Sequence, residues 1–231
     1  MHIPDGFINA PTSLAAGAVA AGGVGASLRR AAQTLQERQA PLTGLVAAYI
    51  FAVQMLNFPV AAGTSGHLLG GVLAAVLVGP WAGCVCVAVV LVVQSLLFAD
   101  GGLTALGLNI TNMAVVGVFG GWAVFRLLRR VLPATRTSVV AASGIAAGVS
   151  VVLAASAFVL EYALGGTGGA PVPTVLAAMV GVHTLIGIGE GVITALTVGV
   201  VLGVRPDLVD GAADLQAPLV LGPEPAPEEV R

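Results

Sequence analysis

The chain has 231 residues, of which 57% are hydrophobic and only 9% are charged, with a formal net charge of −2. A soluble domain carries about 25% charged residues, so the composition excludes a globular protein that covers its surface with solvated charge. A mean hydropathy of +1.01 indicates an integral membrane protein instead.

Seven apolar runs follow one another along the chain, and a helix needs roughly 20 such residues to cross a bilayer. They cover about 10–28, 42–60, 67–80, 83–99, 105–127, 138–160 and 175–203. The third and fourth are short, and Pro80 and Gly83 between them predict a tight helical hairpin. The sequence therefore predicts an all-α integral membrane domain over residues 1–204 with seven transmembrane helices. Residues 205–231 are rich in Pro and acid, which predicts a disordered cytoplasmic tail.

The basic residues indicate the orientation in the membrane, because cytoplasmic loops carry an excess of Arg and Lys. All nine basic residues are arginines, and with seven spans every one falls on the same side. They are Arg29, Arg30, Arg38, Arg126, Arg129, Arg130, Arg136, Arg205 and Arg231. We therefore expect a multi-pass protein of the cell membrane with its amino terminus outside and its carboxyl terminus in the cytoplasm.

Two further features of the sequence bear on whether the chain is an enzyme or a metal-binding protein. The sequence has no GxxxxGK phosphate loop, so we expect that this chain does not hydrolyse nucleotides and is not an enzyme. Catalytic residues, a resident cofactor and a nucleic-acid partner are not expected either. Cys84 and Cys86 form a C-x-C pair able to hold a soft metal, but cysteines inside apolar helices more often serve as small packing residues.

The first residues, MHIPDGF, form a metal chelator if the amine of Met1 is free. That amine and the amide nitrogen of His2 close a five-membered ring on an ion, and the same amide and the His2 Nδ1 atom close a six-membered ring. Such planar nitrogen sites suit Ni(II) or Cu(II) and, less well, Co(II). Since a free amine has a pKa of about 7.7–8, we expect binding to release protons and to strengthen as pH rises.

A second histidine, His67 in GTSGHLLGG, is expected on the same outer side and is able to fill the fourth planar position. The flanking glycines would allow two backbones to approach one ion. The alternative is a solvated terminus at His2 and an ordinary interfacial histidine at His67. Ligand chemistry alone leaves both interpretations open.

Polar residues gather at the outer end of the fifth predicted span, in FADGGLTALGLNITNMAVVG. We expect Asn109 to support the site by binding the His67 loop or by orienting an imidazole. For Asp100 and Thr104, helix capping is an equal alternative. Asn112 is also able to join neighbouring helices.

His183 and Glu190 lie seven residues apart on one face of the last span. Ionisable groups inside a membrane are functional candidates, so the pair is a possible proton or metal relay. The alternative is that both are satisfied interior residues. Gln54 and Asn57 in the second span have the same ambiguity.

MHIPDGF, GTSGHLLGG and FADGGLTALGLNITNMAVVG resemble the CbiM/NikM family over nearly the whole chain. Members are the substrate-binding membrane subunits of energy-coupling-factor transporters for cobalt and nickel. The resemblance implies a seven-helix bundle and a metal held by Met1, His2 and His67. It also implies a membrane coupling subunit, cytoplasmic ATPase subunits and often a small accessory membrane subunit as partners.

Two other transport functions are alternatives to the one that this resemblance implies. A proton-coupled secondary metal transporter would use His183 and Glu190 and need no ATPases. A vitamin-binding subunit would need an aromatic cavity, for which two Trp and two Tyr are few. Nickel and cobalt both stay open as the transported ion.

Overall fold

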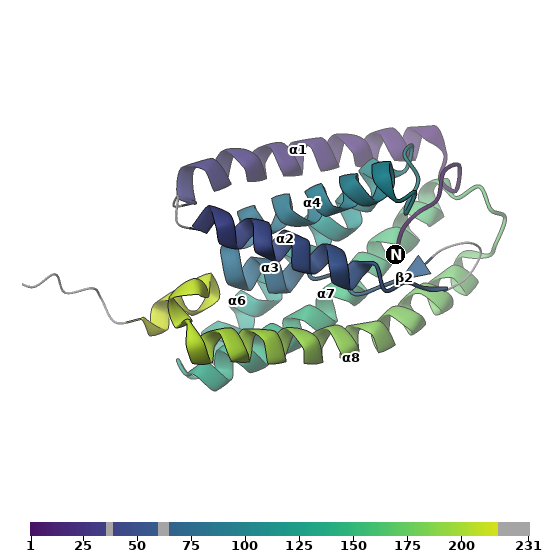
Figure 1. The fold of residues 1–231 in the computed structure, drawn as a ribbon. Coiled ribbons are helices and arrows are strands. Elements are labelled where there is room, and N and C mark those ends of the chain that lie inside the picture. Colours follow the sequence, from purple (N-terminus) through teal and green to yellow (C-terminus); the bar gives the residue numbers. More distant parts are fainter. Residues whose placement is uncertain (36–38, 60–64, 217–231) are drawn as a thin grey trace, which may run out of the picture.

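The computed structural model describes residues 1–35, 39–59 and 65–216. Over these residues the chain is a helical bundle with one antiparallel pair of two-residue strands (Figure 1). The helices are α1 (Ala10–Thr34), α2 (Ala40–Gln54), α3 (Gly71–Val78), α4 (Pro80–Leu97), α5 (Leu106–Ile110), the π-helix η2 (Thr111–Gly120), α6 (Gly121–Val131), α7 (Arg136–Gly165) and α8 (Val172–Val204). The strands are β1 (Phe58–Pro59) and β2 (Ser65–Gly66), and the 3-10 turns η3 (Pro206–Leu208) and η4 (Asp210–Leu215) follow α8.

Four helices of the described part are long and apolar enough to cross a membrane: α4, the continuous helix Leu106–Val131, α7 and α8. They coincide with the predicted spans 83–99, 105–127, 138–160 and 175–203. Helix α1 has 25 residues but is rich in Gly and Ala, and α2 has only 15 residues. The total of seven spans therefore remains a prediction.

The predicted span 67–80 differs from the structure. Only Gly71–Val78 is helical, and eight residues rise about 12 Å, too little for a hydrocarbon core about 30 Å thick. All eight are buried, and α3 contacts α4, α7 and α8. A run that is apolar on every side looks the same in sequence whether lipid or protein surrounds it.

The predicted hairpin between the third and fourth runs is present. Gly79 alone separates α3 from α4, and its φ of +82° is a left-handed conformation that side chains disfavour. A Cβ atom on Gly83 would lie 2.9 Å from the backbone nitrogen of Ala75, so the two helices touch through their backbones.

Helices α7 and α8 form a long pair in the bundle (Figure 1). Their backbones meet at glycines: a Cβ atom on Gly187 would lie 2.7 Å from the carbonyl oxygen of Gly148, and one on Gly191 would lie 2.8 Å from that of Gly144. Small residues four apart permit this close crossing without side-chain interdigitation. The close contact with α7 therefore fixes the rotation of α8 about its own axis.

The first part of the predicted tail continues from α8 as two short turns. Residues 205–216 form two 3-10 turns, and Val209 and Ala212 are buried against the bundle. The turn η4 contacts α3 and α7. The remainder of the predicted tail, 217–231, lies outside the described residues.

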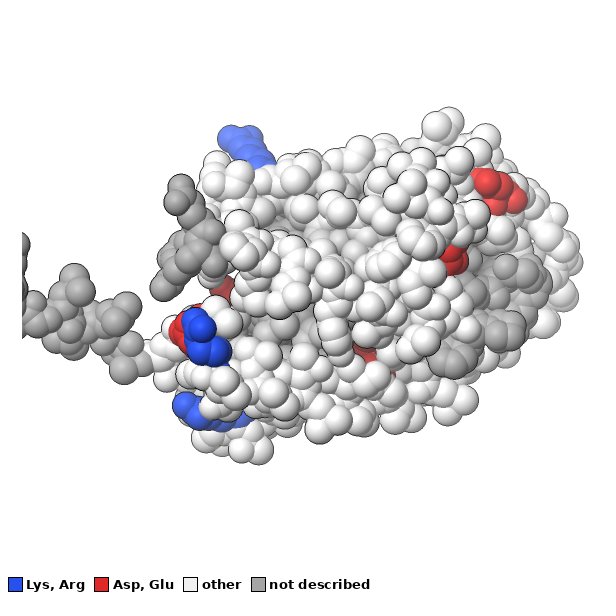
Figure 2. All heavy atoms as spheres, viewed as in Figure 1, with Lys and Arg blue, Asp and Glu red and all other residues white. Residues whose placement is uncertain are grey.

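The described arginines gather at one end of the bundle (Figure 2). They are Arg29, Arg30, Arg126, Arg129, Arg130, Arg136 and Arg205; Arg38 and Arg231 lie outside the described residues. The opposite end holds the amino terminus, residues 98–105 and residues 165–171, which contain no arginine. We refer to these as the arginine end and the amino-terminal end.

Candidate metal site at the amino terminus

The first residues run into the amino-terminal end of the bundle rather than away from it (Figure 1). Met1, His2 and Ile3 are buried, with 1%, 4% and 0% of their surface exposed. Asn109 on α5 holds Ile3 on both sides: its Oδ1 atom accepts a bond of 2.8 Å from the Ile3 amide, and its Nδ2 atom donates one of 3.3 Å to the Ile3 carbonyl. The terminus is therefore fixed directly beside His2.

Further contacts tie residues 5–9 to two loops. The Asp5 carboxylate accepts bonds from the amide and the hydroxyl of Thr104, at 2.7 and 2.5 Å. On the other side, Thr167 donates its hydroxyl proton to the Gly6 carbonyl, and the Asn9 amide bonds the Gly165 carbonyl at 2.7 Å. These hydrogen bonds hold residues 5–9 between the α4–α5 loop and the end of α7 with the loop that follows it.

His67 lies between β2 and α3 in a segment held by two other helices. Gln54 on α2 donates to the Leu69 carbonyl at 2.7 Å. Glu190 on α8 accepts from the amides of Leu69 and Gly70, each at 2.6 Å. Three hydrogen bonds from two helices therefore hold the segment that carries His67.

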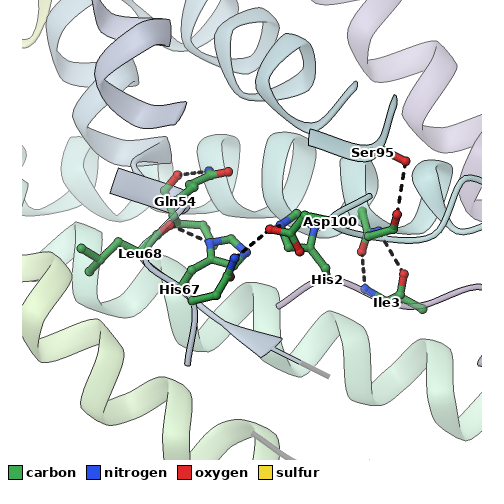
Figure 3. Close-up of polar contacts among 11 residues, drawn as sticks. His2, Ile3, Gln54, His67, Leu68, Ser95 and Asp100 are labelled. Atoms are coloured by element: carbon green, nitrogen blue, oxygen red, sulfur yellow. Dashed lines mark hydrogen bonds and ion pairs between the residues drawn. The ribbon is translucent and has the colours of Figure 1, made fainter. Parts of the chain in front are cut away.

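The two histidines meet, although 65 residues separate them in sequence. Their ring centroids lie 4.6 Å apart, and both side chains are buried (Figure 3). The His67 Nδ1 atom lies 2.8 Å from the Leu68 carbonyl oxygen, which only accepts, so Nδ1 carries the proton. The Nε2 atom therefore has a free lone pair, and it has no hydrogen-bond partner among the described residues. A metal ligand needs such a nitrogen.

Asp100 is the carboxylate beside His2 (Figure 3). Its Oδ2 atom lies 3.5 Å from His2 Nε2 and accepts a bond of 2.8 Å from Asn57 Nδ2. His2 Nε2 has no hydrogen-bond partner among the described residues, so the Asp100 carboxylate faces this atom without bonding to it. A carboxylate beside Nε2 would leave Nδ1 of the same ring as the metal donor. Reasoning from the sequence did not connect Asp100 with His2, because 98 positions separate them; its only signal was an acid directly before two glycines.

Gly101 explains the glycine pair after Asp100. Its φ of +88° is left-handed, and a Cβ atom there would lie 2.9 Å from His2 Nδ1 and 3.0 Å from Asn109 Nδ2. The absence of a side chain at Gly101 therefore leaves space for the His2 imidazole.

Burial keeps the nitrogen atoms of the site neutral. Desolvation lowers the pKa of the Met1 amine to about 4, against the opposing attraction of Asp100. Burial and then the charge of the amine lower the pKa of His2 to about 3. An amine that is already neutral at pH 7 would have no proton to release on chelation, so the pH dependence that we expected from the amine would come from the His2 amide.

The described residues contain no group of three or more His, Cys, Asp or Glu side chains arranged to hold an ion. The nitrogen atoms at the amino-terminal end are instead a terminal amine, an amide and two imidazoles. Met1, His2 and His67, which the sequence predicted together, do lie together here.

The other predicted residues have separate places. Asn109 binds Ile3 rather than the His67 loop. Glu190 clamps the His67 segment with both oxygen atoms, and His183 lies nearby on the same face of α8. Reasoning from the sequence missed Glu161, whose carboxylate accepts a buried bond of 2.7 Å from Asn112.

Known proteins share this architecture. The chain matches CbiM, the cobalt uptake substrate-specific transmembrane region, over residues 2–208. The chain belongs to the CbiM family. It is thus a membrane component of cobalt or nickel uptake, which is consistent with a transport protein rather than an enzyme.

Relatives of the CbiM family extend the comparison. A putative fused nickel transport protein NikMN of Archaeoglobus fulgidus is 40% identical over 92% of this chain and 69% of its own length. A cobalt transport protein CbiM of Sorangium cellulosum is 36% identical over 74% of this chain and 76% of its own length. The crystal structure of a transition metal transporter, 30% identical, superposes with a TM-score of 0.81 over 94% of this chain and all of that one.

Proposed function

We propose that this chain is the substrate-binding subunit of an ATP-driven uptake transporter and captures Ni(II) or Co(II) outside the cell. The Met1 amine, the amide nitrogen and Nδ1 of His2, and Nε2 of His67 bind the ion in a plane. The observation that supports this most is the meeting of two buried imidazoles beside a buried, neutral amine. Planar nitrogen ligands favour nickel, and low-spin cobalt accepts the same set.

The charge distribution supports the orientation. With the arginine end in the cytoplasm, the positive-inside rule is obeyed and the metal site faces the outside of the cell membrane. The neutral donors admit a dication without competing positive charge. Asp100 then stabilises the cation through the His2 ring.

Release of the ion into the cell requires work that no nucleotide-binding motif of this chain provides. We propose that a membrane coupling subunit, cytoplasmic ATPase subunits and a small accessory membrane subunit supply it. The proton-coupled alternative requires Glu190 to exchange protons. Its two oxygen atoms already accept amide bonds, and protonation would weaken them, so we favour Glu190 as a support.

The first experiment compares the protein with its native amino terminus with the same protein carrying two extra residues before Met1. One extra residue is unsuitable as a control, because His2 would become the third residue and the terminus would still chelate through two amides. Calorimetry and visible absorption follow the binding of Ni(II) and Co(II). We expect one ion per native chain, a d–d band of planar nitrogen coordination, and loss of both in the extended protein.

Equal binding by the two proteins would exclude the amine of Met1 as a ligand. Uptake by cells with and without the ATPase subunits tests the energy source. Uptake that persists without ATPases and is lost in Glu190→Gln would support the proton-coupled alternative.

A further inference from the structure

His183 has the same burial and the same hydrogen-bond pattern as His67. It is fully buried on α8, and its Nδ1 atom lies 2.7 Å from the Met179 carbonyl oxygen, so the ring proton resides on Nδ1. The Nε2 atom carries the lone pair and has no hydrogen-bond partner among the described residues. Buried polar atoms are nearly always paired in proteins. The lone pair of His183 Nε2 is therefore available to bind a metal ion.

The position of His183 follows from the Glu190 clamp. Glu190 bonds the amides of Leu69 and Gly70, which fixes one level of α8 against the segment that carries His67. His183 precedes Glu190 by seven residues, which is about 10 Å toward the amino-terminal end. The chain runs from His67 through Leu69 into α3, which runs toward the arginine end. His67 therefore also lies on the amino-terminal side of the level that Glu190 fixes.

A further contact agrees with this placement. Helix α8 contacts strand β2, which ends directly before His67. The segment that carries His67 and the helix that carries His183 therefore pack against each other.

We propose that His67 and His183 form a second, transient metal site, which the ion occupies after it leaves the proposed site at Met1 and His2. The inference rests on the proposed function: an ion that leaves Met1 and His2 stays on His67 Nε2 and gains His183 Nε2 from α8. Imidazole nitrogen suits both nickel and cobalt. Two imidazoles bind an ion less firmly than the planar set does, and a transport position must release its ion as well as accept it.

The test uses a protein in which only these two histidines remain. The chain has three histidines, so a two-residue extension combined with His2→Ala, purified without a histidine tag, leaves His67 and His183. Cu(II) is the probe because it binds such sites most tightly, and pulsed EPR counts the imidazoles on the ion. We expect two imidazoles in this protein and one after His183→Gln, with the affinity lowered at least about tenfold, or about 1.4 kcal/mol.

Controls separate a lost ligand from a damaged fold. Met179→Leu changes a neighbour on the same buried face of α8 and keeps the carbonyl group, so it should leave two imidazoles. In His183→Ala, free imidazole added to the protein should fill the vacated space and restore the two-imidazole signal. A single imidazole before His183→Gln, or two imidazoles after it, would overturn the inference.

The native-terminus protein tests the proposed function independently. If it fails to bind Ni(II), the terminal site and the inference both fall. If it binds Ni(II) normally while the extended His2→Ala protein shows only one imidazole, the terminal site stands and the inference alone is wrong.

Discussion

The two ends of the bundle handle polar groups in opposite ways. At the arginine end, Arg129 pairs with Asp214 at 2.6 Å and Arg205 with Asp207 at 2.8 Å, and both aspartates are exposed. At the amino-terminal end, His2 and His67 are buried beside a neutral amine. Solvated ion pairs contribute little to stability, whereas buried unpaired nitrogen atoms are costly. The difference agrees with the proposed orientation, in which the arginine end lies in the cytoplasm, and with the proposed metal site at the amino-terminal end.

The strongest test of this comparison is Gly101→Ala. The added methyl group would lie 2.9 Å from His2 Nδ1, so we expect nickel affinity to fall by about 100-fold, at the upper end of what displaced supports of a metal ligand cost. The matched control is Gly169→Ala, which has a similar positive φ but no atom within 4 Å of the added carbon. Equal affinities in calorimetric titrations of the two variants would contradict a role of His2 Nδ1 as a ligand.

Removal of the two hydrogen bonds that Glu190 accepts from Leu69 and Gly70 should have the next largest effect on nickel affinity. Glu190→Ala leaves two buried amides without an acceptor, at roughly 1–3 kcal/mol each, and frees the segment that carries His67. We expect a lower unfolding temperature in detergent together with weaker nickel binding. Glu190→Gln keeps one acceptor and should lie between this variant and the native protein. A normal affinity in Glu190→Ala would show that the His67 segment does not need α8.

Asn109→Ala removes both bonds to Ile3 and should weaken nickel binding by about tenfold. The reason is that the terminus must be ordered anew before it chelates an ion. Asn109→Asp retains the acceptor for the Ile3 amide and should lose less. Equilibrium dialysis measures both, and an unchanged affinity in Asn109→Ala would show that chelation itself orders the terminus.

The Asp5 contact adds a small pH dependence. The hydroxyl and then the amide of Thr104 lower the pKa of Asp5. A lowered folded-state pKa stabilises the docked segment above the ordinary value of 3.8 and loses this effect as pH falls through the folded-state pKa. The protection of the Thr104 amide against hydrogen exchange, measured relative to its intrinsic rate at each pH, should therefore be lost only in acid. In Asp5→Ala this protection should be low at every pH.

Substitutions at the arginine end should have the smallest effect on stability and on nickel affinity. Asp214→Asn removes an exposed partner of Arg129 and should cost about 1 kcal/mol or less. Nickel affinity should not change, because the pair lies at the other end of the bundle. A loss of affinity comparable to that of Asn109→Ala would show that the two ends are coupled.

Local chemistry explains which features were predictable. Apolar runs identified α4, α7 and α8 because length and composition suffice for a long helix in lipid. The chelating terminus was also visible, because the amine, amide and imidazole of Met1 and His2 are neighbours in the chain. The α3 region failed for the converse reason, since an apolar run does not say whether lipid or protein surrounds it.

The sequence by itself therefore determined the membrane environment, the long helices, the charged end and the donor atoms of the terminus, all of which depend on composition or on adjacent residues. Only the tertiary structure decided which distant groups meet there. Asp100 beside His2, Asn109 on Ile3 and Glu190 beneath the His67 segment are separated by about a hundred residues each. Such contacts arise from the packing of helices against one another, which no local pattern encodes.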